Sequence, residues 1–181
     1  TFTNGGVAYD GYNTAIGYQS LFANNPTVIT NANKNTAVGF EASRNNTQGT
    51  SNTTVGTSAA RSNTTGSNNV AIGDSALYAN NQSDITAVGT KALRNNQSTW
   101  NTAVGAYSLY KNTSGFTNTA IGYRSMVENI DGYRNTVVGA NTLDNNTSGY
   151  QNVGVGYYVL DNNTLGNTNT AMGSYALRLN T

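Results

Sequence analysis

The chain is built on a repeat marked by glycine and asparagine. Ten times, a glycine follows a short apolar segment, and an asparagine stands seven residues after each of these glycines. Successive glycines are 22, 17, 17, 16, 16, 17, 17, 17 and 17 residues apart. Self-similarity at so short a period indicates one structural unit stacked on itself. The repeat glycines are Gly17, Gly39, Gly56, Gly73, Gly89, Gly105, Gly122, Gly139, Gly156 and Gly173.

The residues before each repeat glycine have the alternation of a β-strand. Counted from the glycine, position −1 is Val, Ile or Met, position −3 is Thr or Val, and position −2 is mostly Ala. After the glycine, position +3 is mostly Ser or Ala and position +4 is usually Leu, which predicts a second short strand. We therefore expect an all-β solenoid of about ten coils, each of 16–17 residues with two short strands. Parallel pairing at about 4.8 Å per coil gives a rod roughly 48 Å long.

The two faces of the first strand predict an assembly. We expect Val and Ile at position −1 to fill the coil interior, and Ala with the repeat glycine to form the opposite face. A strand buried on both faces needs a second layer, which a thin coil does not supply. Another copy of the same chain, related by closed rotational symmetry, would supply it about a central axis. The pattern therefore predicts a homo-oligomer.

The asparagine at position +7 is expected to form a ladder of stacked side-chain amides. Asparagine also tolerates the left-handed backbone of turns. The alternative is glycan attachment at Asn-x-Ser/Thr matches such as Asn45 and Asn63, but an Asn/Thr-rich repeat produces such matches automatically. The ladder residues are Asn24, Asn46, Asn63, Asn80, Asn96, Asn112, Asn129, Asn146, Asn163 and Asn180.

Composition excludes several classes of function. Only 9% of residues are charged, against roughly 25% in typical domains, and the net charge is +1. Scattered charges give no basic stripe, so we expect no nucleic-acid partner. Without cysteine or histidine, the chain lacks disulfides and the commonest metal ligands, and we expect no metal and no cofactor. No apolar run approaches the ~18 residues of a membrane span, so we expect no membrane insertion by this segment.

The domain organisation is expected to be simple. Residues 1–12 are interpreted as the end of a preceding coil or a cap, and residues 13–181 as the solenoid. Without an initiating Met or a signal peptide, the chain is interpreted as a segment of a longer protein.

The repeat unit resembles that of known trimeric fibres. Asn101-Thr-Ala-Val-Gly105 and Asn118-Thr-Ala-Ile-Gly122 are similar to the head repeats of YadA-like trimeric autotransporter adhesins and to repeats of phage-type trimeric tail fibres. The resemblance covers residues 13–181. It implies a left-handed parallel β-roll, a homotrimer, and an extracellular location on a cell surface or virion fibre. It also implies attachment to a surface glycan or a cell-surface receptor.

Two places depart from the plain repeat and are candidate ligand sites. The first coil carries extra residues within 24–34, including Pro26, Val28 and Ile29, and insertions in repeat proteins emerge on one face that often binds. The alternative is a loop that packs on a neighbouring domain or chain.

The second place is a row of aromatic residues on successive coils: Phe116, Tyr133 and Tyr150, which Trp100 extends if its register allows. Such a row either stabilises the turns by stacking or offers a platform for sugar rings.

One pair of acidic residues has an enzyme-like spacing. Asp144 and Asp161 occupy position +5 of adjacent coils, about 5 Å apart if stacked, which is close to the carboxyl separation of retaining glycosidases. No apolar pocket surrounds them in the pattern, so we expect no enzyme activity.

The function expected from the sequence is therefore a rigid stalk or head of an extracellular adhesive fibre. The alternatives are an ice-binding β-solenoid and a tailspike-type fibre that degrades polysaccharide. Ice binding requires Thr at paired positions on an exposed strand, whereas we expect Val and Ile at position −1 to point inward.

Overall fold

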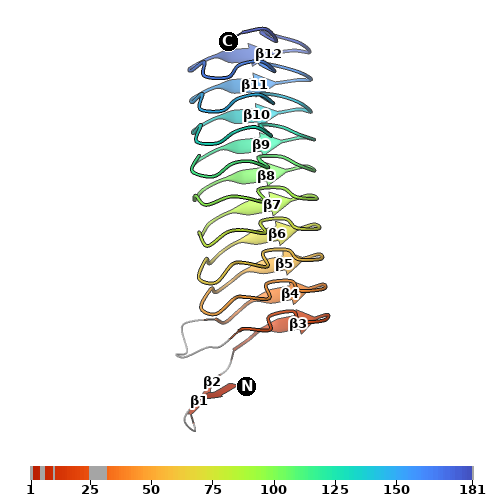
Figure 1. Cartoon of the computed structure of the whole chain (residues 1–181), viewed down its shortest axis with the longest axis vertical. Coiled ribbons are helices and arrows are strands. Elements are labelled where there is room, and N and C mark those ends of the chain that lie inside the picture. Colours follow the sequence, from red (N-terminus) through yellow and green to blue (C-terminus); the bar gives the residue numbers. More distant parts are fainter. Residues whose placement is uncertain (1, 5–6, 10, 25–31, 181) are drawn as a thin grey trace.

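The computed structural model of the chain describes residues 2–4, 7–9, 11–24 and 32–180. It is a rod of stacked coils with β-strands and no helix in the described part (Figure 1). Near the N-terminus, β1 (Phe2–Asn4) and β2 (Val7–Tyr9) form a two-stranded antiparallel sheet separate from the coils. The β-solenoid expected from the repeat is thereby confirmed.

Ten parallel strands form one sheet along the rod. Their spatial order follows the chain, and each strand pairs in register with the next, so that Thr102 lies opposite Thr119 and Val104 opposite Ile121. The strands are β3 (Thr14–Ile16), β4 (Thr36–Val38), β5 (Thr53–Val55), β6 (Val70–Ile72), β7 (Thr86–Val88), β8 (Thr102–Val104), β9 (Thr119–Ile121), β10 (Thr136–Val138), β11 (Val153–Val155) and β12 (Thr170–Met172).

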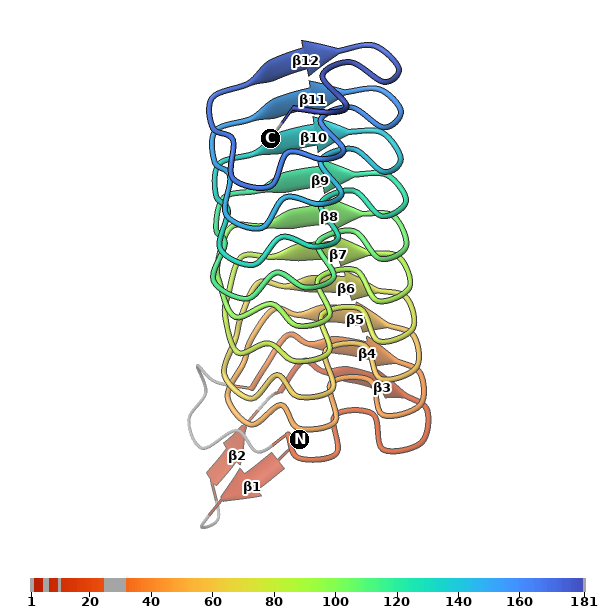
Figure 2. The same cartoon turned by 45° about the horizontal axis from the view of Figure 1, so that its top comes forward.

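The expectation of two strands per coil is wrong, because each described coil contains one. After the repeat glycine, the residues at positions +2 and +4 have positive φ, as at Tyr107 (61°) and Leu109 (50°). Their amides bond in opposite directions, Tyr107 to the carbonyl of Thr90 in the preceding coil and Leu109 to that of Ser125 in the following coil. This alternating backbone satisfies its hydrogen bonds between coils without an extended conformation. Figure 2 shows the strands on one side of the rod and these segments on the other.

The expected assignment of the two strand faces is also wrong. Position −2 points inward, and Ala103 is fully buried against the interior side of the coil, as are Ser108 and Leu109 from positions +3 and +4. Position −1 points outward, and Ile16 and Met172 are 59% and 71% exposed. Successive side chains alternate across a strand, so only one of the two columns points inward. Ala is the usual inward residue opposite Leu, and Val137 takes the same place opposite Leu143.

The repeat glycine is required by packing within one chain. Gly105 has φ of 129°, and a Cβ placed on it would lie 2.4 Å from the carbonyl oxygen of Gly122 in the next coil. Only glycine allows this backbone and this approach. The interpretation that these glycines form a face where chains meet is therefore replaced by contact between successive coils.

The asparagines at position +7 are buried and joined by side-chain hydrogen bonds. The Nδ2 of Asn112 donates to the Oδ1 of Asn96 at 2.7 Å, and also to the carbonyl of Gly115 in its own coil at 2.8 Å. The same pattern continues through Asn129 and Asn146. The glycine carbonyl of the turn is thereby satisfied without water.

A second asparagine column, at position −4, carries a further ladder. The backbone amide of Asn118 donates to the Oδ1 of Asn101 at 2.9 Å, while the Nδ2 of Asn118 donates to the carbonyl of Gly132 at 2.8 Å. Asn129 donates to the same Gly132 carbonyl. The two ladders therefore converge on one turn in coils that carry both asparagines; the coil of Ile85 lacks the asparagine at position −4.

Candidate functional site

The outer face of the ten-stranded sheet is a regular surface that runs along the rod. It carries two columns, mostly Thr at position −3 and Val or Ile at position −1, and no described segment of the chain covers it. Several apolar side chains on it are more than a third exposed: Ile16, Ile72, Ile121, Val138, Val153 and Met172. An apolar surface that repeats along a whole rod indicates an interaction face.

The aromatic row expected from the sequence is present as three stacked rings. The rings of Phe116 and Tyr133 are 5.0 Å apart and 3° from parallel, and those of Tyr133 and Tyr150 are 4.8 Å apart and 6° from parallel. The side chains are half-buried. Because the ring faces turn toward one another, the face that a sugar would stack on is occupied within the row. This geometry supports stabilisation of the turns.

Trp100 does not extend this row. Its φ of 57° matches that of Thr117, and the amide of Thr117 donates to the carbonyl of Thr99. In the next coil, the amide of Arg134 donates in the same way to Phe116, so Thr99 is the equivalent of Phe116. Trp100 thus lies in the column of Thr117 and Arg134; the residue is 62% exposed and its indole contacts no other ring in the described part of the chain.

The two acidic residues at position +5 are each neutralised by an arginine. Asp144 lies 3.2 Å from the Nη2 of Arg124, and Asp161 lies 3.5 Å from the Nε of Arg178. Both aspartates are buried, and the Oδ1 of Asp144 has no hydrogen-bond partner among the described residues. Burial raises the pKa of Asp144, Arg124 opposes the rise, and the charge of Asp161 adds to it. The pair thus resembles a charge network more than an acid and base facing a substrate.

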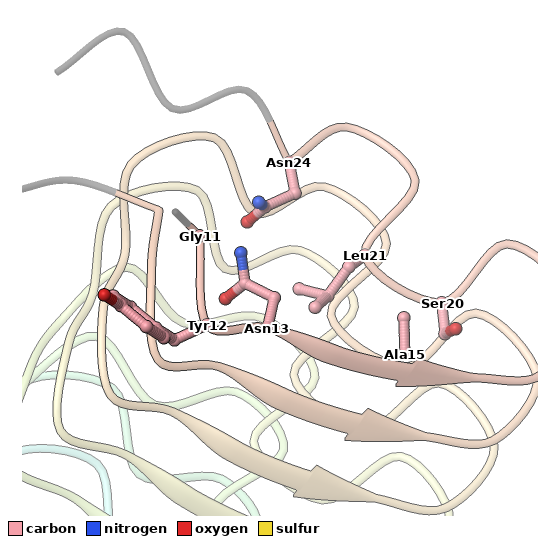
Figure 3. A pocket seen from close by; sticks show the side chains of 7 residues that line it. All are labelled: Gly11, Tyr12, Asn13, Ala15, Ser20, Leu21 and Asn24. Carbon is pink, nitrogen blue, oxygen red and sulfur yellow. The ribbon is translucent and has the colours of Figure 1, made fainter. Parts of the chain in front are cut away.

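A hollow of about 310 Å³ opens at the N-terminal end of the solenoid. Figure 3 shows the side chains of Asn13, Leu21 and Asn24 around it, next to Ala15 of β3. These residues lie at positions whose side chains point into the coil. In later coils, the coil before covers the equivalent side chains. The Nδ2 atoms of Asn13 and Asn24 both donate to the carbonyl of Ala32, at 2.8 and 3.0 Å, so the hollow offers few free donors.

The insertion of the first coil was the other expected ligand site. Pro26, Val28 and Ile29 lie outside the described residues. The structure therefore does not bear on their role.

A further surface combines cations with tyrosines on the segment after the repeat glycine. We call it the basic-aromatic strip; it comprises position +5 of four successive coils and position +2 of two of them. Its central contact places the guanidinium of Arg94 5.0 Å from the ring centre of Tyr78. The periodic column at position +5 could have revealed it, but only Asp144 and Asp161 of that column were considered as a site from the sequence. The strip consists of Arg61, Tyr78, Lys91, Arg94, Tyr107 and Tyr110.

Comparison with known proteins adds no family. No family model, no curated protein and no solved structure matches the chain. Among the described residues, no helix is long and apolar enough to cross a membrane, and no three acidic residues lie close enough together to hold a metal ion. The class of protein that the fold defines is a parallel β-solenoid repeat protein.

Proposed function

We propose that this chain is a rigid segment of an extracellular trimeric fibre that attaches to a cell surface or glycan. The observation that carries the proposal is the outer sheet face, where an apolar column and a threonine column run in register over ten strands. The resemblance of the repeat unit to the repeats of left-handed trimeric β-rolls supports the same architecture. The fibre then consists of three solenoids side by side.

The chemistry of the outer face favours further copies of the same chain as its partner. Its side chains are short, β-branched and uncharged, so the columns of three copies pack about an axis without burying a charge. Burying a fully exposed Val or Ile side chain contributes about 1.5–3 kcal/mol, and the partly buried side chains of this column contribute a fraction of that each. Because the strands are stacked at one regular spacing, a single alignment of the copies buries all ten rows together.

The mass of the folded chain in solution tests this proposal. We expect light scattering to give a trimer, and the double substitution Val104→Glu/Ile121→Glu to give a monomer, because it would bury two charges per chain at the axis. Gln48→Glu/Ser114→Glu adds the same charge at exposed positions away from the sheet and should remain trimeric. A monomeric parent chain would contradict the trimer. Binding of the parent chain to cells and to a glycan array tests attachment.

Ice binding is the second candidate, and one observation favours it. The threonine and Val/Ile columns both point outward, which removes the objection raised by the expected inward orientation of position −1. Rows spaced about 4.8 Å apart then repeat regularly along an exposed sheet. A trimer covers this face, whereas an ice binder leaves it open. Thermal hysteresis in a monomeric sample would support ice binding, and its absence would remove this candidate.

A further inference from the structure

The cations of the basic-aromatic strip differ from others on the same side of the rod. Lys91 and Arg94 have no carboxylate within ion-pair distance in the described part of the chain, and Arg61 shares Glu41 with another arginine. In later coils, Arg124 is paired with Asp144. Lys111 and Arg178 are likewise paired, with Glu128 and Asp161. The strip therefore presents positive charge that the chain itself does not neutralise.

Tyrosine rings hold these cations in place. Arg94 lies over the ring of Tyr78 at 5.0 Å, and Arg61 approaches the same ring at 5.9 Å and donates to the tyrosine hydroxyl at 3.0 Å. The ammonium of Lys91 lies 5.3 Å from the ring centre of Tyr107. Cation–π contacts of this kind orient a side chain while leaving most of its N–H donors free. The Nη1 of Arg94 makes one weak bond of 3.3 Å to Asn95.

The strip ends on its C-terminal side at a reversal of charge; on its N-terminal side the next residue at position +5 is Arg44, which is ion-paired with Glu41. Along position +5, the sequence of side chains is Arg61, Tyr78, Arg94 and Tyr110, followed by Val127 and then by two aspartates. Four coils at about 4.8 Å span roughly 15–20 Å. A nucleic acid would require a longer row of cations to neutralise its phosphates. A short acidic ligand with apolar ring faces matches the strip better.

We propose that the basic-aromatic strip binds an anionic saccharide, one that carries carboxylate or sulfate groups. Arg94 and Lys91 pair with the acidic groups. The guanidinium of Arg94 donates two parallel hydrogen bonds to a carboxylate or sulfate, and the ammonium of Lys91 acts as a point charge. Tyr110, whose ring is 5.8 Å from that of Tyr107 and tilted by 58° to it, contacts the apolar face of a sugar ring, while Lys91 lies over the ring of Tyr107. This inference rests on the proposed function, because it names the ligand class of the fibre. The strip lies on the segments after the repeat glycines, on the side of the rod away from the sheet. It therefore stays accessible when copies of the chain meet through the outer sheet face.

Binding to polyanionic glycans tests the inference directly. The parent chain is titrated against heparin as a sulfated probe, hyaluronan as a carboxylated probe and dextran as a neutral control, at physiological ionic strength. We expect binding to at least one polyanion and none to dextran. Lys91→Ala/Arg94→Ala should weaken this binding at least about tenfold, the change expected when a charge-assisted hydrogen bond is lost.

A matched variant separates a site from general charge. Lys34→Ala/Arg134→Ala removes the same two charges from exposed positions that also lack a carboxylate partner in the described part of the rod. It should bind as the parent does. Circular dichroism and mass measurement confirm that both variants keep the fold and oligomer. Equal weakening by the two variants, or a parent chain that binds neither polyanion, would overturn the inference.

The outcome for this site is distinguishable from the outcome for the fibre. A trimer that attaches to cells or to neutral glycans while ignoring both polyanions contradicts the anionic-saccharide site and leaves the proposed function standing. A monomer that binds heparin through Arg94 supports the site and contradicts the trimeric fibre.

Discussion

Asn129 and Asn112 are joined by a hydrogen bond of 2.6 Å from the Nδ2 of the first to the Oδ1 of the second, one coil apart and with both side chains fully buried. The Nδ2 of Asn129 also donates to the Gly132 carbonyl at 3.0 Å. Each amide thus acts between coils and within its own turn. The chain of such bonds runs from Asn80 to Asn180.

Replacing Asn112 with Ala should destabilise the rod. The Oδ1 of Asn96 keeps only its bond from Asn101, the Nδ2 of Asn129 loses its side-chain acceptor, and the Gly115 carbonyl loses one of its two donors. Unsatisfied buried groups of this kind cost about 1–3 kcal/mol. Denaturant unfolding measures the loss. Asn45→Ala is the control, because this half-exposed asparagine makes no side-chain hydrogen bond in the described part of the chain. Equal stability of the two variants would argue against the ladder.

Two glycine variants separate backbone strain from a steric clash. Gly173 has a positive φ of 105° and no atom within 4 Å of the place where a Cβ would lie, whereas Gly105 combines a φ of 129° with the carbonyl of Gly122 at 2.4 Å from that place. Gly173→Ala should therefore cost only strain, of order 1–3 kcal/mol. Gly105→Ala should cost more, or prevent folding, because a backbone atom has to move. If the two variants lost similar stability in thermal unfolding, the close contact between coils would not be the reason for glycine at this position.

The stacked aromatic row should show its effect in stability. Tyr133 stacks with two rings and Phe116 with one. Each aromatic pair contributes about 0.5–1.5 kcal/mol beyond the area it buries. Tyr133→Ala should therefore lower the free energy of unfolding more than Phe116→Ala does. If Tyr133→Ala instead removed glycan binding and left stability unchanged, the row would be a binding platform.

The buried carboxyl of Asp144 should make stability depend on pH. Burial raises the pKa of Asp144 above its ordinary value of 3.8, with Arg124 opposing the rise. Above the raised pKa, the folded state holds a charge that it disfavours, and this cost disappears as pH falls below 3.8 because the carboxyl is then protonated in both states. Asp144→Asn should therefore be more stable than the parent chain at neutral pH, and the difference should vanish in acid.

Chemical denaturation at several pH values measures this difference. Asp131→Asn removes one negative charge from an exposed position and corrects for the change in net charge. If Asp144→Asn were less stable than the parent at neutral pH, the ion pair with Arg124 would outweigh the cost of burial.

The repeat was sufficient to predict stacked coils and a ladder at the positions of Asn112 and its equivalents, because strict columns require in-register pairing. The orientation of the strand was not predictable from residue size alone. Val104 looks like a core residue, but Ala103 takes the inward position opposite Leu109, and alternation along the strand turns Val104 outward. The second segment was mistaken for a strand because Leu at position +4 is buried, and nothing in the residue types signals the positive φ of Tyr107 and Leu109.

The register of the aromatic row also depended on the backbone. The coil of Trp100 is one residue shorter than the coils of Phe116, Tyr133 and Tyr150, so counting from the glycine left its column ambiguous. The hydrogen bond from Thr117 to Thr99 resolves it.

The sequential strand order makes the rod a molecular ruler. Because each coil contacts only the coils beside it, length is a free variable: excising the 17 residues from Asn118 to Arg134 would join equivalent positions and shorten the rod by about 4.8 Å. The length of the rod and its ligand binding can therefore change independently, since any coil whose outward side chains do not contact a ligand can be added or removed.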